Sequence, residues 1–162
     1  MCKCECCVCN DCCGKNSKTI HAQLSSSVDQ PNGPLGTGVP ITFNIQDSIH
    51  GVGHLPGSSE VHISEDGLYF VLAAPQTGAT CDCGFTSDYW MKVNGDNVAN
   101  SNVRFVASNS ESKDVIVTQG VLKLKDGDVL QIFGAGLTSK CEAITQMGEP
   151  LVPSIIFTMY KV

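Results

Sequence analysis

The sequence predicts an all-β sandwich or jelly roll behind a short cysteine-rich arm, and three observations lead to this prediction. Apolar residues fall in short runs separated by Gly, Pro, Asn and Ser, as expected of about nine or ten short strands. The composition, with 16 Gly and 7 Pro in 162 residues, favours turns over helices. Seven of the 10 cysteines lie before residue 14. We therefore expect a connector arm over residues 1–17 and a single domain over residues 18–162.

Four strands are expected in the first half of the chain, over residues 19–24, 39–45, 61–63 and 68–74. Residues 39–45 alternate apolar and polar side chains, which indicates a half-buried strand. Residues 68–74 are continuously apolar, too short for a typical helix and rich in β-forming residues. We therefore expect a central strand there, buried on both faces. Loops rich in Gly and Pro, over residues 30–38 and 49–59, separate these strands.

Six further strands are expected over residues 89–93, 103–107, 115–118, 121–124, 129–133 and 155–162. Asn94 and Gly95 follow the first of these and are a strong signal for a two-residue hairpin. Asp126, Gly127 and Asp128 mark another turn, where Asp side chains accept backbone hydrogen bonds. The stretches over residues 77–87 and 134–153 are expected to be loops.

The charge pattern argues against nucleic acid and membrane partners. The net charge is −6 with only 10 Lys and Arg, so no basic cluster is available for phosphates or anionic lipid. No stretch approaches the ~18 apolar residues of a membrane span. Met1 is followed directly by cysteines and not by an apolar segment, so we expect no secretory leader.

Four segments carry a resemblance to a known family. Residues 63–71 (ISEDGLYFV), 92–95 (KVNG), 122–130 (LKLKDGDVL) and the apolar end at 155–160 resemble, in order and spacing, motifs of the TNF/gC1q-like jelly-roll family. The resemblance covers about residues 41–162, and the bacterial branch found on Bacillus-type spore surfaces is the most similar. It implies a ten-stranded jelly roll that forms a compact homotrimer. The cysteine arm is not a feature of that family.

The last expected strand also points to a partner subunit. Ile155, Phe157 and Met159 lie on one of its faces, and Ile156, Thr158 and Tyr160 lie on the other. A monomeric sandwich buries only one face of a strand, so a second subunit is the simplest cover for the other. The alternative is a long loop of the same chain. The residues expected at the trimer interface are Tyr69, Val71, Ile155, Phe157, Met159 and Tyr160.

The cysteines of the arm are Cys2, Cys4, Cys6, Cys7, Cys9, Cys12 and Cys13, and the loops carry Cys81, Cys83 and Cys141. In an extended chain the arm presents thiols on both sides, which suits a strap between two neighbours. Adjacent cysteines cannot pair without strain. Seven is an odd number, so at least one arm cysteine must pair with a loop cysteine or with another chain. We therefore expect all ten cysteines to be candidates for intersubunit disulfides.

Two other chemistries compete with disulfide formation. The spacing of Cys6, Cys9 and Cys12 also fits thiolate ligands of a metal, which is the weaker alternative, and no cofactor is expected. His50 and His54 frame a short Gly-rich loop that could hold a metal, although such histidines are more often solvated. No catalytic motif is found, so we expect no enzymatic activity.

These observations predict a structural subunit of a disulfide-crosslinked, homotrimer-based surface assembly or filament, of the endospore appendage or exosporium type. Without a leader, we expect the protein on the spore surface or outside the cell after lysis of the mother cell. The alternatives are a trimeric binding head, such as an adhesin or a phage or spore tip module, and a thiolate metal-binding protein.

Overall fold

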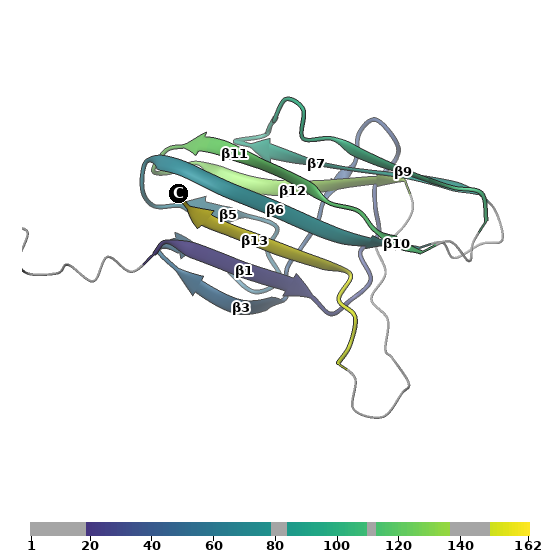
Figure 1. Cartoon of the computed structure of the whole chain (residues 1–162), viewed down its shortest axis with the longest axis horizontal. Coiled ribbons are helices and arrows are strands. Elements are labelled where there is room, and N and C mark those ends of the chain that lie inside the picture. The colour runs from purple at the N-terminus through teal and green to yellow at the C-terminus, as the bar shows by residue number, and fades with distance from the viewer. Residues whose placement is uncertain (1–18, 79–83, 110–112, 137–149) are drawn as a thin grey trace, which may run out of the picture.

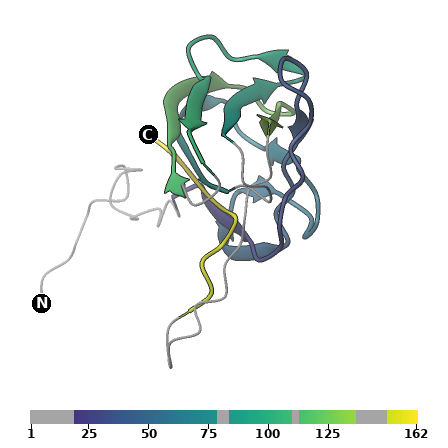
Figure 2. The same cartoon turned by 90° about the vertical axis from the view of Figure 1, so that its right-hand side faces the viewer.

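The computed structural model describes residues 19–78, 84–109, 113–136 and 150–162 (Figure 1). Within these ranges the chain forms thirteen strands and no helix, in two antiparallel sheets packed face to face. Viewed along the strands, the two sheets enclose the core between them (Figure 2). The all-β prediction is therefore confirmed. Among the described residues, no helix has the length and apolar character needed to cross a membrane.

The first sheet has the strand order β10-β6-β13-β1-β3, and β11 also pairs with β6. The strands are β1 (His21–Ser26), β3 (Ile45–His50), β6 (Gly67–Thr77), β10 (Asp114–Val115), β11 (Thr118–Leu124) and β13 (Ile155–Lys161). The N-terminal strand β1 therefore lies beside the C-terminal strand β13, with His21 opposite Tyr160. Figure 1 shows this pairing of the two ends of the described chain.

The second sheet has the order β4-β5-β12-β7-β8, with β2 beside β12 and β9 beside β7. The strands are β2 (Val39–Pro40), β4 (Val52–Gly53), β5 (Val61–Ile63), β7 (Phe85–Val93), β8 (Asp96–Asn97), β9 (Val103–Ala107) and β12 (Val129–Gly136). Asn94 and Gly95 both have positive φ, 52° and 87°, as a hairpin turn of type I′ requires. The predicted hairpin between β7 and β8 is thus confirmed.

The core lies between the sheets and is built from alternate residues of the long strands. Its largest fully buried side chains include Phe43, Tyr69, Tyr89, Phe157 and Met159. The Tyr69 hydroxyl donates a hydrogen bond to the Glu65 carbonyl oxygen at 2.9 Å, which satisfies its polar end. Burial raises the pKa of Tyr69, because the charged phenolate would lose its hydration.

Several expected boundaries were wrong. Within residues 39–45 only the two ends are in strands, at β2 and at Ile45, the first residue of β3, although Ile41 and Phe43 are buried in the core. The expected loop over 49–59 contains the end of β3 and all of β4, and β6, β7 and β12 extend into the other expected loops. The central strand β6 was expected to be buried on both faces, but Leu68 is 50% exposed, because no element of the described chain covers its outer side.

Candidate functional site on the outer face of the first sheet

The first sheet presents an apolar surface to solvent, which we call the apolar face. It consists of Leu68, Phe70, Leu72, Val121, Ile156 and Tyr160. Side chains alternate along β6, β11 and β13, so these residues point away from the core while their neighbours point toward it. Four of them, Leu68, Val121, Ile156 and Tyr160, are 38–60% exposed, and Phe70 and Leu72 are half-buried.

Strand register brings the apolar face together across three neighbouring strands. Phe70 of β6 lies opposite Tyr160 of β13 on one side and opposite Val121 of β11 on the other. The rings of Phe70 and Tyr160 are in contact, with centroids 5.3 Å apart. These contacts form a continuous apolar row through Val121, Phe70 and Tyr160. Polar residues lie beside the rest of the face: Gln119 and Thr158 opposite Leu72, and Lys123 opposite Leu68.

Polar side chains border the apolar face on β1 and β3. His21 lies opposite both Tyr160 and His50. The Nε2 atom of His21 is 2.8 Å from the Ser48 hydroxyl. Gln23, the next outward residue on β1, is exposed. An apolar centre with a polar border is the usual anatomy of a protein–protein interface.

The structure places most of the expected interface residues elsewhere. Five of the six, namely Tyr69, Val71, Ile155, Phe157 and Met159, are 0% exposed in the core of the chain itself. They lie on the inward side of β6 and β13, so a partner subunit cannot reach them. Tyr160 alone of this set lies on the outer face, at 43% exposed. The expectation of a second, uncovered side to the last strand stands, but its residues are Ile156 and Tyr160.

All ten cysteines lie outside the described residues, so their expected pairing stays a prediction. The residues that flank them are informative about position. Ile20, close to the arm, accepts a hydrogen bond from the Lys161 amide at 2.9 Å at one end of the first sheet. At the opposite end, Ile155 pairs with Pro75 near the close of β6. The flanks of the Cys141 loop and of the Cys81 and Cys83 loop also meet in the second sheet, where Gly136 pairs with Ser87.

Of the two loop histidines expected to be solvated, His54 is instead buried, and both of its ring nitrogens contact groups of the same chain. His54 is 8% exposed; its Nδ1 accepts from the Gln46 amide at 3.2 Å, and its Nε2 lies 3.2 Å from the Ser58 carbonyl oxygen. Burial lowers the pKa of His54, because the charged imidazolium would lose its hydration. His50 lies at the edge of the sheet and is exposed. Within the described ranges, no three His, Cys, Asp or Glu residues are grouped to hold a metal ion.

Asp128 is a turn residue. Its carboxylate accepts hydrogen bonds from the Lys125 amide and the Asn94 side chain, both at 2.8 Å. These bonds favour the charged form and lower the pKa of Asp128. One oxygen is thus used within the turn and the other ties the turn to the hairpin at Asn94, which agrees with the structural role that the sequence predicts for Asp in such turns.

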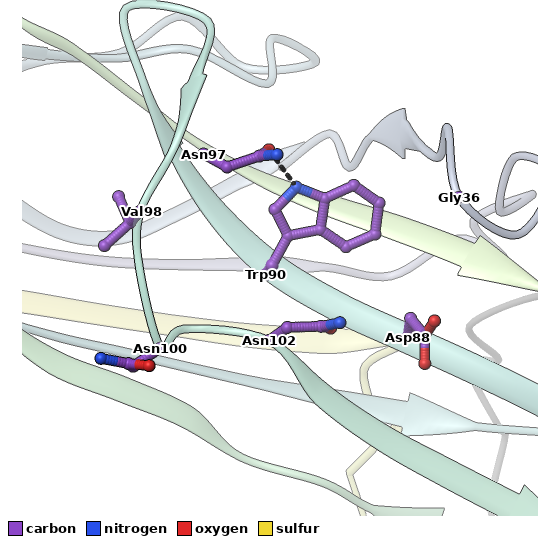
Figure 3. A pocket seen from close by; sticks show the side chains of 7 residues that line it. All are labelled: Gly36, Asp88, Trp90, Asn97, Val98, Asn100 and Asn102. Carbon is purple, nitrogen blue, oxygen red and sulfur yellow. Dashed lines mark hydrogen bonds between the residues drawn. The ribbon is translucent and has the colours of Figure 1, made fainter.

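One pocket was missed by the sequence analysis. It has a volume of about 210 Å³ and lies on the outer face of the second sheet, around Trp90 (Figure 3). Its lining is Gly36, Asp88, Trp90, Asn97, Val98, Asn100 and Asn102. Two features of the sequence could have indicated this pocket. Asn recurs between residues 97 and 102, and the preceding strand carries Asp88 and Trp90 on the same side.

Known proteins resemble this chain in structure but not in sequence. No family model and no curated protein sequence matches it. The globular domain of zebrafish complement 1qA protein is similar in structure, with a TM-score of 0.56 and 12% identity over 88% of this chain and 97% of that domain. The TNF protein Eiger from S. frugiperda is also similar, with a TM-score of 0.60 and 15% identity over 89% of this chain and 92% of Eiger. The chain therefore has the jelly-roll fold shared by TNF and C1q globular domains, as its sequence motifs predicted.

Proposed function

We propose that this chain is a structural subunit that forms a homotrimer through its apolar face and is joined to further subunits by disulfides of its cysteine arm. The observation that carries the proposal is the apolar face itself. It spans three adjacent strands and carries two large rings in contact, Phe70 and Tyr160. Soluble monomers rarely leave a continuous surface of this kind uncovered. The resemblance to TNF and C1q domains, which commonly form homotrimers, favours two further copies as the cover.

The positions of the arm and of the loops support a head-to-tail connection between trimers. His21 is paired with Tyr160, and Tyr160 is paired with Phe70, so His21 and Phe70 lie at the same end of the first sheet. From Phe70, strand β6 continues for seven residues to Thr77 at the other end. At ~3.3 Å per residue, the two ends lie about 23 Å apart. The first described residues after the arm lie at one end, and the described flanks of the cysteine loops lie at the other. A contact between unlike ends that does not close on itself generates a filament.

The arm is long enough for this connection. The arm, residues 1–17, can span at most about 60 Å when extended. Each crosslink forms by one of two routes. In the first, a thiolate of the arm attacks a disulfide that involves a cysteine of the other subunit, so that a new S–S bond forms, the old one breaks and its second sulfur leaves as a thiolate. In the second, two thiols lose two protons and two electrons to an oxidant such as dioxygen or an oxidised low-molecular-weight disulfide. In the second case one S–S bond forms and the oxidant is reduced. We place such an assembly on a spore surface, following the family resemblance.

The experiment that tests the assembly uses the full chain under oxidising and reducing conditions. Electron microscopy and non-reducing gels should reveal filaments or ladders of linked subunits that disappear with reductant. A variant with all seven arm cysteines changed to Ser should stop at the trimer, whereas Cys141→Ser alone tests one acceptor loop. Only monomers on the non-reducing gel of the oxidised wild-type chain would contradict the crosslinking. Intramolecular disulfides would appear instead as a faster-migrating monomer.

Localisation needs a separate test. Antibodies against the described domain should label intact spores of the source organism. Unlabelled spores that release the protein only on disruption would contradict a surface position, while leaving the trimer and the crosslinks to the experiments above.

A further inference from the structure

The pocket around Trp90 is assembled from three segments: the turn at Gly36, strand β7, and the segment from β8 to β9 that follows β7. Strand β7 directs Tyr89 and Met91 into the core, so Asp88 and Trp90 point outward. The segment from β8 to β9 folds back beside them and brings three asparagines, Asn97, Asn100 and Asn102. Gly36 closes the pocket from the turn that precedes β2. Figure 3 shows the indole of Trp90 between Asn97 on one side and Asn102 and Asp88 on the other.

The indole is held in place from several directions. The Trp90 Nε1 donates a hydrogen bond to the Asn97 Oδ1 at 2.9 Å. The ring packs against Phe133 of the neighbouring strand, with centroids 5.8 Å apart. Its far edge lies so close to Gly38 that a Cβ atom there would come within 2.3 Å of the ring. A ring fixed before a ligand arrives loses little conformational entropy on binding.

The polar lining carries no unbalanced charge. The Asp88 side chain is 6% exposed, and both of its oxygens accept hydrogen bonds from Arg104, each at 2.7 Å. This bidentate pair neutralises the only carboxylate of the pocket. The other polar groups are the amides of Asn97, Asn100 and Asn102, all on exposed residues. Each amide offers an acceptor and two donors, which suits hydroxyl groups because these also both donate and accept.

We propose that this pocket binds one neutral sugar ring, such as a terminal pyranose of a glycan. The apolar C–H side of a pyranose fits against the indole of Trp90, and its hydroxyls reach the Asn100 and Asn102 amides. A volume of about 210 Å³ is smaller than the ~300–1,000 Å³ of pockets for drug-sized ligands, so it accommodates a single ring. None of the described residues that line the pocket is cationic, so a phosphorylated or carboxylated sugar gains no ion pair with the lining.

The pocket does not depend on the proposed assembly. It lies on the second sheet, whereas the apolar face lies on the first. A subunit whose apolar face is covered by its neighbours therefore keeps the pocket on its other side. The sugar site and the trimer can be tested, and can fail, separately.

Tryptophan fluorescence of the full chain tests the proposal directly, since Trp90 is the single tryptophan of the sequence. Titrations with galactose, mannose, fucose, rhamnose and N-acetylglucosamine should give a saturable change in emission for at least one sugar, at a Kd on the order of 1 mM. Glucose 6-phosphate and sialic acid should give none. A glycan array, read by a tag, identifies the preferred terminal sugar without using the indole as reporter.

Variants of the lining distinguish a built site from nonspecific contact. Asn102→Ala changes an exposed side chain and should weaken binding by about 3- to 10-fold, the effect of one hydrogen bond. Trp90→Ala should abolish binding on the array, while Val106→Ala, elsewhere on the same outer face, should leave it unchanged. The proposal is overturned if no neutral sugar binds at about 50 mM, well above the expected Kd. It is equally overturned if binding survives both Trp90→Ala and Asn102→Ala, or if charged sugars bind as well as neutral ones.

Discussion

The two outer faces of the sandwich differ in the contacts that their aromatic side chains make. On the first sheet, Phe70 and Tyr160 contact each other, and their other outward neighbours include Leu68 and Val121. On the second sheet, Trp90 and Phe133 are also paired, but each has a polar partner from the same chain. Asn97 accepts the indole hydrogen bond, and the Lys92 ammonium lies 4.2 Å from the centre of the Phe133 ring. The second face is thus completed within one chain, whereas the first would be completed by the proposed trimer.

The largest expected effect is a loss of stability that distinguishes the inward side of β13 from its outward side. Phe157→Ala, on the inward side of β13, should lower the free energy of unfolding by about 3–5 kcal/mol, because it leaves a cavity among fully buried side chains. The adjacent Ile156→Ala, on the outward side, should cost much less when the protein is dilute enough to be monomeric. Urea unfolding of both variants measures this. Equal losses would mean that the two sides of β13 are not distinct.

The next largest expected effect is a loss of self-association when a charge is placed on the first face. Phe70→Asp places a charge at the centre of the apolar face and should weaken self-association by at least about 30-fold, the effect of losing one interface hot spot. Lys92→Asp is the matched control, because it also introduces an aspartate, but on the outer face of the second sheet. Sedimentation over a range of concentrations gives the oligomeric state. Unchanged trimers for Phe70→Asp would rule out the apolar face as the interface.

A smaller effect tests the packing of the second face. Gly38→Ala would bring a Cβ atom within 2.3 Å of the Trp90 ring, at a residue with φ of 64°. Gly57→Ala is the control, since its φ is 88° but nothing lies within 4 Å of the added Cβ. Both variants place an alanine in the left-handed backbone region and lose stability for that reason. The further loss in the free energy of unfolding of Gly38→Ala, about 1–3 kcal/mol, therefore measures overpacking against Trp90. Gly38→Ala alone should shift the tryptophan emission, and equal stabilities would contradict tight packing.

The smallest effect is a pH dependence from the core between the faces. The pKa of His54 is lowered in the folded chain because the ring is buried, whereas the unfolded chain binds this proton near pH 6.5. As the pH falls through about 6.5, the unfolded state gains a proton that the folded state does not, so stability falls. Urea unfolding at pH 7.5 and 5.5 should show a smaller pH effect for His54→Gln than for the wild type. Identical pH effects would exclude His54 as a contributor.

The sequence predicted the elements better than their orientation. The hairpin at Asn94 and Gly95 and the strands around it follow from local turn chemistry, which the chain carries in adjacent residues. The inward side of β6 and β13 was not predictable in the same way. Both sides of each strand are apolar, so alternation separates Tyr69 from Phe70 without saying which one meets the opposite sheet. Only the pairing of distant strands decides that.

The pocket was beyond sequence reasoning for a related reason. Its lining joins Gly36, Asp88 and Asn102, which are brought together by the packing of a turn, a strand and a returning loop. The sequence of each segment alone predicts an ordinary turn or strand, and asparagine is common in loops. The bidentate pair of Asp88 with Arg104 depends on the register of β7 with β9, where these two residues lie directly opposite each other.

The position of β1 between β13 and the edge strand β3 has a mechanical consequence. If subunits are connected as proposed, tension enters at His21 and leaves from the opposite end of the sandwich, so the force runs parallel to the strands. The hydrogen bonds that join β1 to β13 and to β3 lie across this direction, and they share the load instead of opening one after another. Strand β1, held on both sides, would then act as a shear clamp, and a fibre of such subunits would resist pulling better than bending.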